Sequence, residues 1–84
     1  MVTIKFFSLL RETLGTDQLS VDLPQTVTTV AELKQWLADT HGEIWRDMLF
    51  QPNVVHAVNQ EVASLEQAVA EGDEIAFFPP MTGG

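Results

Sequence analysis

The stretch TVAELKQWL, residues 29–37, is the strongest indication of the fold in this 84-residue chain. Thr29 and Glu32 have the spacing of a capping box, in which each side chain accepts a hydrogen bond from the other residue's backbone N–H at a helix start. Apolar side chains then recur every three or four positions, which predicts one amphipathic helix that runs to about Thr40 and stops at Gly42. The apolar stripe consists of Val30, Leu33 and Leu37, with Trp36 beside it.

Strand patterns lie on both sides of this helix in the sequence. Alternating or β-branched apolar residues predict strands over residues 2–7, 19–23, 54–58, 62–65 and 74–78. The order strand, strand, helix, strand, short strand, strand predicts one mixed sheet packed on one main helix, which supplies a right-handed crossover to a later parallel strand. The fold class is therefore α+β, and the arrangement is the ubiquitin-like β-grasp.

Two shorter helices and two turns complete the predicted elements. Ser8 is a candidate cap for a helix over residues 9–14 that ends at Gly15. A second short helix is expected from Ile44, Trp45, Met48 and Leu49, ending before Pro52. The segments 59–60 and 71–73 have the composition of turns.

The chain divides into a domain, residues 1–78, and an extended C-terminal tail, residues 79–84. Pro79 and Pro80 end the last strand because proline has no backbone N–H for the ladder, and two prolines favour a stiff, projecting backbone. A flexible Gly83-Gly84 pair follows, and residues 75–84 carry no charge. Because glycine has no Cβ, such a tail can enter a channel that is too narrow for side chains.

Composition excludes several function classes. Twelve acidic residues against four basic ones give a net charge of −8, which disfavours binding to nucleic acid or to anionic membrane surfaces. The charge is explained either by solubility or by steering towards a basic partner. Zero cysteines, and two histidines without ligand spacing, predict no metal site and no nucleophilic constellation. The N-terminus has no signal-peptide pattern, so we expect a cytoplasmic protein.

Three apolar residues are expected on the sheet face opposite the helix. If Ile4, Phe6, Ile75 and Phe77 face the helix, strand alternation turns Phe7 and Phe78 outward. Val62 in the short strand could join them. The alternative is that loops cover both phenylalanines. An exposed apolar group on a small domain favours a docking patch for a partner protein.

Several motifs together resemble a known family. The end of the chain, GDEIAFFPPMTGG (residues 72–84), is similar to the C-terminal signature of the molybdopterin synthase small subunit, the MoaD-type ubiquitin-like sulfur carrier. Residues 4–7, Arg11-Glu12 with Gly15, and residues 57–60 agree with the same family. The resemblance covers nearly the whole chain. Met81 occupies a position that is often valine in the family, which is a conservative difference.

The resemblance implies a sulfur carrier in molybdenum cofactor biosynthesis. In such a protein the carboxylate of Gly84 is adenylated by a ubiquitin-activating-type adenylyltransferase, which consumes ATP, and then becomes a thiocarboxylate with sulfur from a persulfide donor. The tail, here Pro80, Met81, Thr82 and Gly83, inserts into the active site of the large subunit of molybdopterin synthase. Sulfur then passes to a cyclic pterin precursor and builds the molybdopterin dithiolene.

The same resemblance implies a heterotetramer of two small and two large subunits, with no cofactor bound by the small subunit alone. Phe7, Val62 and Phe78 fall at the docking contact with the large subunit, and Arg11 is a further docking candidate. The residues support this assignment, because a chain without cysteine has Gly84 as its one place to carry transferable sulfur. The chain has no catalytic machinery of its own, so the catalytic acids and bases would lie in its partners.

Three other functions fit parts of the pattern. A sulfur carrier of the thiamine pathway also ends in Gly-Gly, although such carriers tend to be shorter and to lack the Phe-Phe-Pro-Pro run. A ubiquitin-like protein modifier would be joined through Gly84 to lysines of target proteins. A plain interaction domain would leave the tail without a role.

Overall fold

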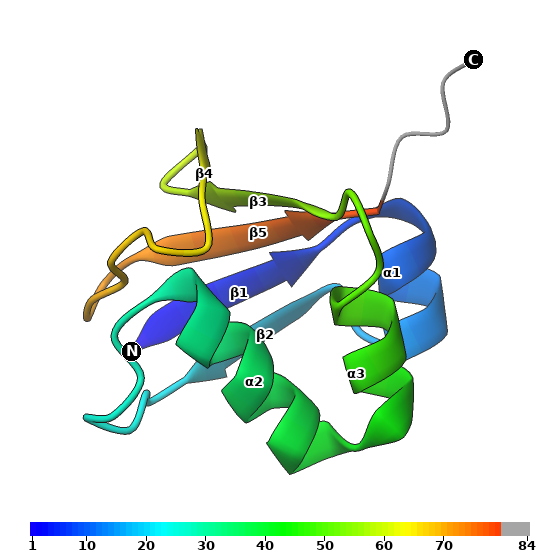
Figure 1. Ribbon diagram of the computed structural model, residues 1–84, viewed down its shortest axis with the longest axis horizontal. Helices are drawn as coiled ribbons and strands as arrows, with labels where there is room; N and C mark the ends of the chain where they lie inside the picture. Colours follow the sequence, from blue (N-terminus) through cyan, green and yellow to red (C-terminus); the bar gives the residue numbers. More distant parts are fainter. Residues whose placement is uncertain (80–84) are drawn as a thin grey trace.

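Five strands and three helices follow one another in the computed structural model, which describes residues 1–79 (Figure 1). In chain order they are β1 (Val2–Phe6), α1 (Ser8–Leu14), β2 (Gln18–Val21), α2 (Val30–His41), α3 (Glu43–Leu49), β3 (Val55–Val58), β4 (Glu61–Ala63) and β5 (Glu74–Phe78). The strands form a single mixed sheet in the order β2-β1-β5-β3-β4. The central pair, β1 and β5, is parallel, and the other pairs are antiparallel. The predicted ubiquitin-like β-grasp is confirmed.

The core lies between the sheet and α2 with α3 (Figure 1). Phe6 of β1 and Phe77 of β5 are neighbours in the parallel register, and their rings stack with centroids 5.8 Å apart. Trp45 of α3 meets Phe6 edge-on at 5.2 Å. The stripe predicted on α2 is confirmed, since Leu33 and Leu37 are fully buried. Burying side chains of this size is the main stabilising contribution in a domain this small.

The start of α2 is hydrogen-bonded to the loop that follows β4. The backbone N–H of Val30 donates to the carbonyl of Gln67 at 3.0 Å, and that of Ala31 donates to the carbonyl of Leu65 at 2.9 Å. These bonds satisfy two of the donors that a helix start leaves free. They also explain why β4 ends at Ala63 rather than near residue 65, because the chain must leave the sheet to reach α2.

Two predicted helix caps need correction. Thr29 does accept a hydrogen bond from the Glu32 N–H at 3.2 Å, but the Glu32 carboxylate accepts from the backbone N–H of Thr28, at 2.8 Å, and not from that of Thr29. Ser8 does not cap α1: it is the first helical residue, with a left-handed φ of 53°, and Phe7 occupies the cap position without a side-chain bond. A capping serine needs an extended backbone, which Ser8 does not have.

The turn between β3 and β4 fixes the register of the short hairpin. Asn59 and Gln60 both have positive φ, 50° and 71°, as in a type I′ turn, so Glu61 pairs with Val58 and β4 begins one residue earlier than predicted. The Asn59 amide also accepts from the Glu74 N–H at 3.0 Å and donates to the Asp73 carboxylate at 3.1 Å. The hairpin is thereby tied to the start of β5.

Candidate functional site

The sheet face opposite α2 contains a hollow of about 340 Å³, called here the outer hollow. Figure 1 shows α2 and α3 on the other side of the sheet. The lining of the outer hollow comes from β1 and the residue that follows it, from β5 and from the β3–β4 hairpin. It consists of Lys5, Phe7, Ala57, Gln60, Val62, Glu74, Ala76 and Phe78. All three apolar residues predicted for this face are among them.

Cross-strand register explains why a hollow forms at this place. Lys5, Ala76, Ala57 and Val62 pair in turn across β1, β5, β3 and β4, so their side chains share one face. The two central residues are alanines, which are buried yet too short to fill the face. They form the floor, while the longer side chains at both ends form the rim. Neither alanine stands out in the sequence, because only the register sets them side by side.

An aromatic pair forms one wall of the outer hollow. The rings of Phe7 and Phe78 are nearly parallel, at 7°, with centroids 4.7 Å apart, and both residues are half-buried. The Phe7 N–H donates to the carbonyl of Phe77 at 3.2 Å, which joins the chain after β1 to the last strand. Stacked aromatic rings are stabilised beyond the area they bury, so this wall is held in place before any partner arrives.

The remaining rim combines an ion pair with an exposed valine. Lys5 Nζ lies 3.2 Å from a carboxylate oxygen of Glu74, and both side chains are about one-third exposed, at 36% and 32%. Val62 is 82% exposed, the highest value among the large apolar side chains of residues 1–79. An apolar side chain left in water at the rim of an apolar hollow favours a protein surface as the occupant. Lys5 and Glu74 were not predicted as site residues.

The tail begins beside this hollow. β5 ends at Phe78, and Pro79 is the last described residue. The predicted tail-insertion residues Pro80, Met81, Thr82 and Gly83, and the predicted sulfur-bearing residue Gly84, lie outside the described residues. Six residues follow Phe78, and such a length of chain spans at most about 20 Å.

Arg11 is not part of the outer hollow. It lies on α1 and lines a separate, shallow depression with Glu12, Gly15, Thr16 and Asp17. Its role as a docking residue stays a prediction, since Arg11 does not line the outer hollow with Phe7, Val62 and Phe78.

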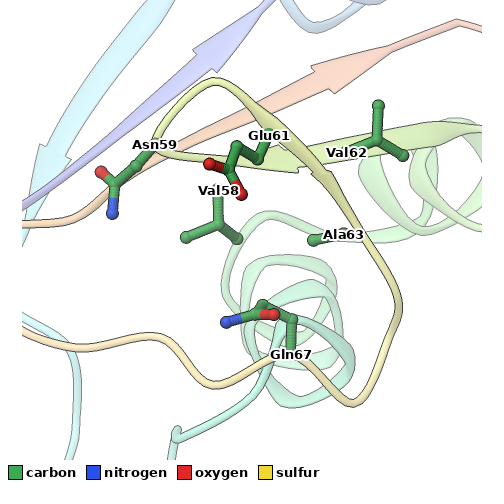
Figure 2. A pocket seen from close by; sticks show the side chains of 6 residues that line it. All are labelled: Val58, Asn59, Glu61, Val62, Ala63 and Gln67. Atoms are coloured by element: carbon green, nitrogen blue, oxygen red, sulfur yellow. The ribbon is translucent and has the colours of Figure 1, made fainter.

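A second depression, of about 260 Å³, lies on the other side of the β3–β4 hairpin. Figure 2 shows Val58, Ala63 and Gln67 around it, while Val62 extends away from them. Asn59 and Glu61 complete its lining, so the depression holds one carboxylate and no nucleophile. This arrangement supports no specific chemistry.

Other site types find little support within residues 1–79. No three histidine, aspartate or glutamate side chains gather there as a metal site would need. His41 stacks on Trp45 with ring centroids 3.9 Å apart, and His56 lies within the sheet. In the same part of the chain, the helices are too short and too polar to cross a bilayer.

Comparison with known proteins gives matches along the whole chain. The model of the ThiS family matches residues 4–84. The molybdopterin synthase sulfur carrier subunit of Escherichia coli is 38% identical over 86 residues, and that of Haemophilus influenzae is 39% identical over 84 residues; each match covers 100% of both chains. The crystal structure of small archaeal modifier protein 1 from Haloferax volcanii superimposes with a TM-score of 0.82 and 30% identity, covering 99% of this chain and 98% of that one.

Proposed function

The chain belongs to the ThiS family, and from this premise we propose that it is the sulfur carrier subunit of a molybdopterin synthase. The observation that carries the proposal is the full-length match to two bacterial sulfur carrier subunits, which covers this chain up to Gly84. A sulfur carrier of the thiamine pathway, which would also end in Gly-Gly, is the related alternative. Both named relatives favour molybdenum cofactor synthesis.

The proposed chemistry takes place at Gly84. A carboxylate oxygen of Gly84 attacks the α-phosphorus of ATP on an adenylyltransferase, and pyrophosphate leaves, so the acyl carbon gains a good leaving group. The terminal sulfur of a persulfide then attacks this carbon and AMP departs. A thiol cleaves the resulting sulfur–sulfur bond, and the chain ends in a thiocarboxylate. In the large subunit this sulfur is transferred to the cyclic pterin precursor, and two such transfers complete the dithiolene.

The outer hollow supports the docking step of this proposal. It lies beside the end of β5, so a partner that covers the hollow also receives the tail. Its floor and one wall are apolar, and its one ion pair is already formed between Lys5 and Glu74, which lowers the cost of covering it. We propose the large subunit of molybdopterin synthase as the occupant, in a heterotetramer of two small and two large subunits in the cytoplasm.

The sulfur-carrier proposal predicts a defined change of mass. After incubation with ATP, an adenylyltransferase of the ubiquitin-activating type and a persulfide donor with a thiol, intact-mass spectrometry should show one oxygen replaced by one sulfur. Fragmentation should place that sulfur on Gly84, because the chain has no cysteine. A reaction without ATP is the control. An unchanged mass under complete conditions would exclude the carrier function.

The docking proposal predicts that Phe78→Ala weakens binding of the large subunit at least tenfold. Aromatic side chains in the covered centre of an interface contribute about 2 kcal/mol or more to binding, and here the change also removes the ring stacked on Phe7. Calorimetric titration of the large subunit would measure the loss. Ile44→Ala is the matched control, because Ile44 is 63% exposed but lies on α3, across the sheet from the hollow. Equal affinity of the Phe78→Ala variant and the wild type would show that the outer hollow is not the docking site.

The likeness to small archaeal modifier protein 1 favours a second candidate, a protein modifier joined to lysines through Gly84. Both functions need an adenylated terminus, and they differ in the nucleophile that attacks it: a persulfide sulfur in one case and a lysine amine in the other. Expression of an epitope-tagged chain separates them. Shifted protein bands that disappear when Gly84 is deleted would support conjugation, whereas a thiocarboxylate alone would support sulfur transfer.

A further inference from the structure

A buried lysine meets a histidine beneath the β3–β4 hairpin. Lys34 of α2 is 5% exposed, and its Nζ lies 3.2 Å from Nε2 of His56 on β3. The ammonium also lies 4.7 Å from the centre of the Phe50 ring, and the His56 ring meets Phe77 edge-on at 5.7 Å. The two residues are 22 positions apart in the sequence. Because Lys34 lies on α2 and His56 lies on β3, the pair joins the helical layer to the sheet.

No carboxylate neutralises this pair among residues 1–79. Glu74 of β5 binds Lys5 on the outer face, Arg46 of α3 binds Asp39 of α2, and the Glu32 carboxylate of α2 accepts hydrogen bonds from Thr28. Glu61 of β4 lies on the same sheet face as His56 but pairs with Val58, two residues along β3. In this part of the chain neither Glu61 nor the Glu43 and Asp47 carboxylates of α3 form an ion pair with Lys34 or His56. A buried ammonium without an anionic partner is costly, so its hydrogen bond to His56 matters.

This hydrogen bond exists in one protonation state of His56. A lysine ammonium can only donate, so Nε2 of His56 must accept, and the imidazole must be neutral. A proton on Nε2 would place two cations 3.2 Å apart. The pKa of His56 is accordingly lowered from its ordinary value by burial and then by the charge of Lys34, and the Ala63 carbonyl opposes part of this shift. Burial likewise lowers the pKa of Lys34.

The hairpin is the side of this contact that can move. α2 is anchored by Val30, Leu33 and Leu37, which are fully buried. β4 has three residues and lies at the edge of the sheet, with Val62 in water. Short edge strands open at low free-energy cost. Because β3, which carries His56, also pairs with β5 and has Val58 buried, repulsion between Lys34 and His56 should open the hairpin from its edge strand β4 rather than displace the helix.

We propose that Lys34 and His56 form a pH-sensitive latch that holds the β3–β4 hairpin against α2 and releases it when His56 takes up a proton. The direction follows from the lowered pKa of His56. A closed hairpin binds fewer protons than an open one, so the closed state is favoured at high pH and loses stability as pH falls through the ordinary range of histidine. The hairpin contributes Ala57, Gln60 and Val62 to the outer hollow, so its release also deforms that surface.

Hydrogen exchange measured by NMR tests the latch in the full chain. On going from about pH 7.5 to about pH 5.5, the opening constant of the hairpin amides, corrected for intrinsic exchange, should rise about tenfold, because an exposed histidine is about tenfold more protonated than neutral at the lower pH. Amides of β1 and β2 should show a much smaller change. In the same samples, the pKa of the His56 ring should lie below the ordinary histidine value of about 6.5.

Two variants separate the latch from general acid loosening. His56→Gln keeps an acceptor for Lys34 but cannot take up a proton, so the pH dependence of hairpin exchange should vanish. Lys34→Met removes the positive charge beside His56 and should reduce the pH dependence of hairpin exchange. His41→Gln is the control and should behave as wild type. The latch is wrong if wild-type hairpin exchange changes no more than that of β1 and β2, or if the pKa of His56 is at or above the ordinary histidine value of about 6.5. Both readouts need only the wild-type chain.

A binding measurement tests the link to docking, which rests on the proposed function. As the pH is lowered, affinity for the large subunit should decrease more steeply for the wild type than for the His56→Gln variant. If the wild-type hairpin opens at low pH but the wild type and the His56→Gln variant lose affinity equally, the latch stands and the proposed use of the hollow is wrong. If neither the hairpin nor the affinity responds, the latch itself is overturned.

Discussion

Deletion of Gly84 is expected to abolish sulfur transfer while leaving the domain folded. The shortened chain would still end in a glycine carboxylate, but this group would lie one residue, or about 3.4 Å, short of its position in the partner's active site. A misplacement of about 1 Å can already cost a factor of about 100 in rate, so transfer should fall by at least that factor. Thiocarboxylate formation by mass spectrometry and single-turnover molybdopterin synthesis would measure the two steps separately.

The matched control for this deletion is Met81→Val. It changes a tail side chain, keeps the tail length, and introduces the residue that is common at this position in the family. It should retain most of the wild-type rate. Thermal unfolding of both variants should match the wild type, because the core lies within residues 1–79. A deletion variant that transfers sulfur at the wild-type rate would show that the terminal carboxylate is not the reacting group.

Phe77→Ala is expected to produce the largest loss of stability among single substitutions in β5. The ring is fully buried and stacked on Phe6, and replacing such a phenylalanine costs about 3–5 kcal/mol in the free energy of unfolding. Domains of this length have a total free energy of unfolding of about 4–13 kcal/mol, so the substitution removes a large share of it. Urea denaturation followed by tryptophan fluorescence would measure the change, since Trp45 contacts the same cluster.

The neighbouring substitution provides the comparison. Phe78 faces the outer hollow and is half-buried, so Phe78→Ala should remove the stack on Phe7, about 0.5–1.5 kcal/mol, and part of the buried area. Adjacent phenylalanines should therefore differ severalfold in stability effect, with the smaller effect at the residue proposed to bind the partner. Similar losses at both positions would contradict the assignment of the two sheet faces.

Much of the fold could be predicted because it depends on local patterns. The bounds of β5 were predicted correctly, since a Gly-containing turn precedes the strand and Pro79 follows it. The stripe on α2 was also correct, because its 3.6-residue period does not depend on partners. The errors occur where distant backbone intervenes. The carbonyls of Leu65 and Gln67 accept hydrogen bonds from the first amides of α2, so the chain leaves the sheet after Ala63. No local pattern in the sequence indicates these bonds.

The candidate site was predicted in part. Strand alternation placed Phe7 and Phe78 on the outer face, and Val62 was expected to join them; the structure brings all three to one hollow. Arg11 lies elsewhere, because a family motif does not specify which surface α1 presents. The tail residues lie outside the described residues, so their roles stay predictions.

Local patterns were enough to predict the class of the fold, the sides of the strands and the chemical character of the tail. Periodicity and backbone preference are properties of neighbouring residues, and the absence of cysteine is a property of composition. The order of the strands in the sheet and their register became clear from the three-dimensional packing. That register sets Ala57 beside Ala76 to form the floor of the outer hollow, and the packing of α2 on the sheet brings Lys34 to His56. Contacts between residues far apart in the chain depend on how whole layers pack, and no short stretch of sequence contains that information.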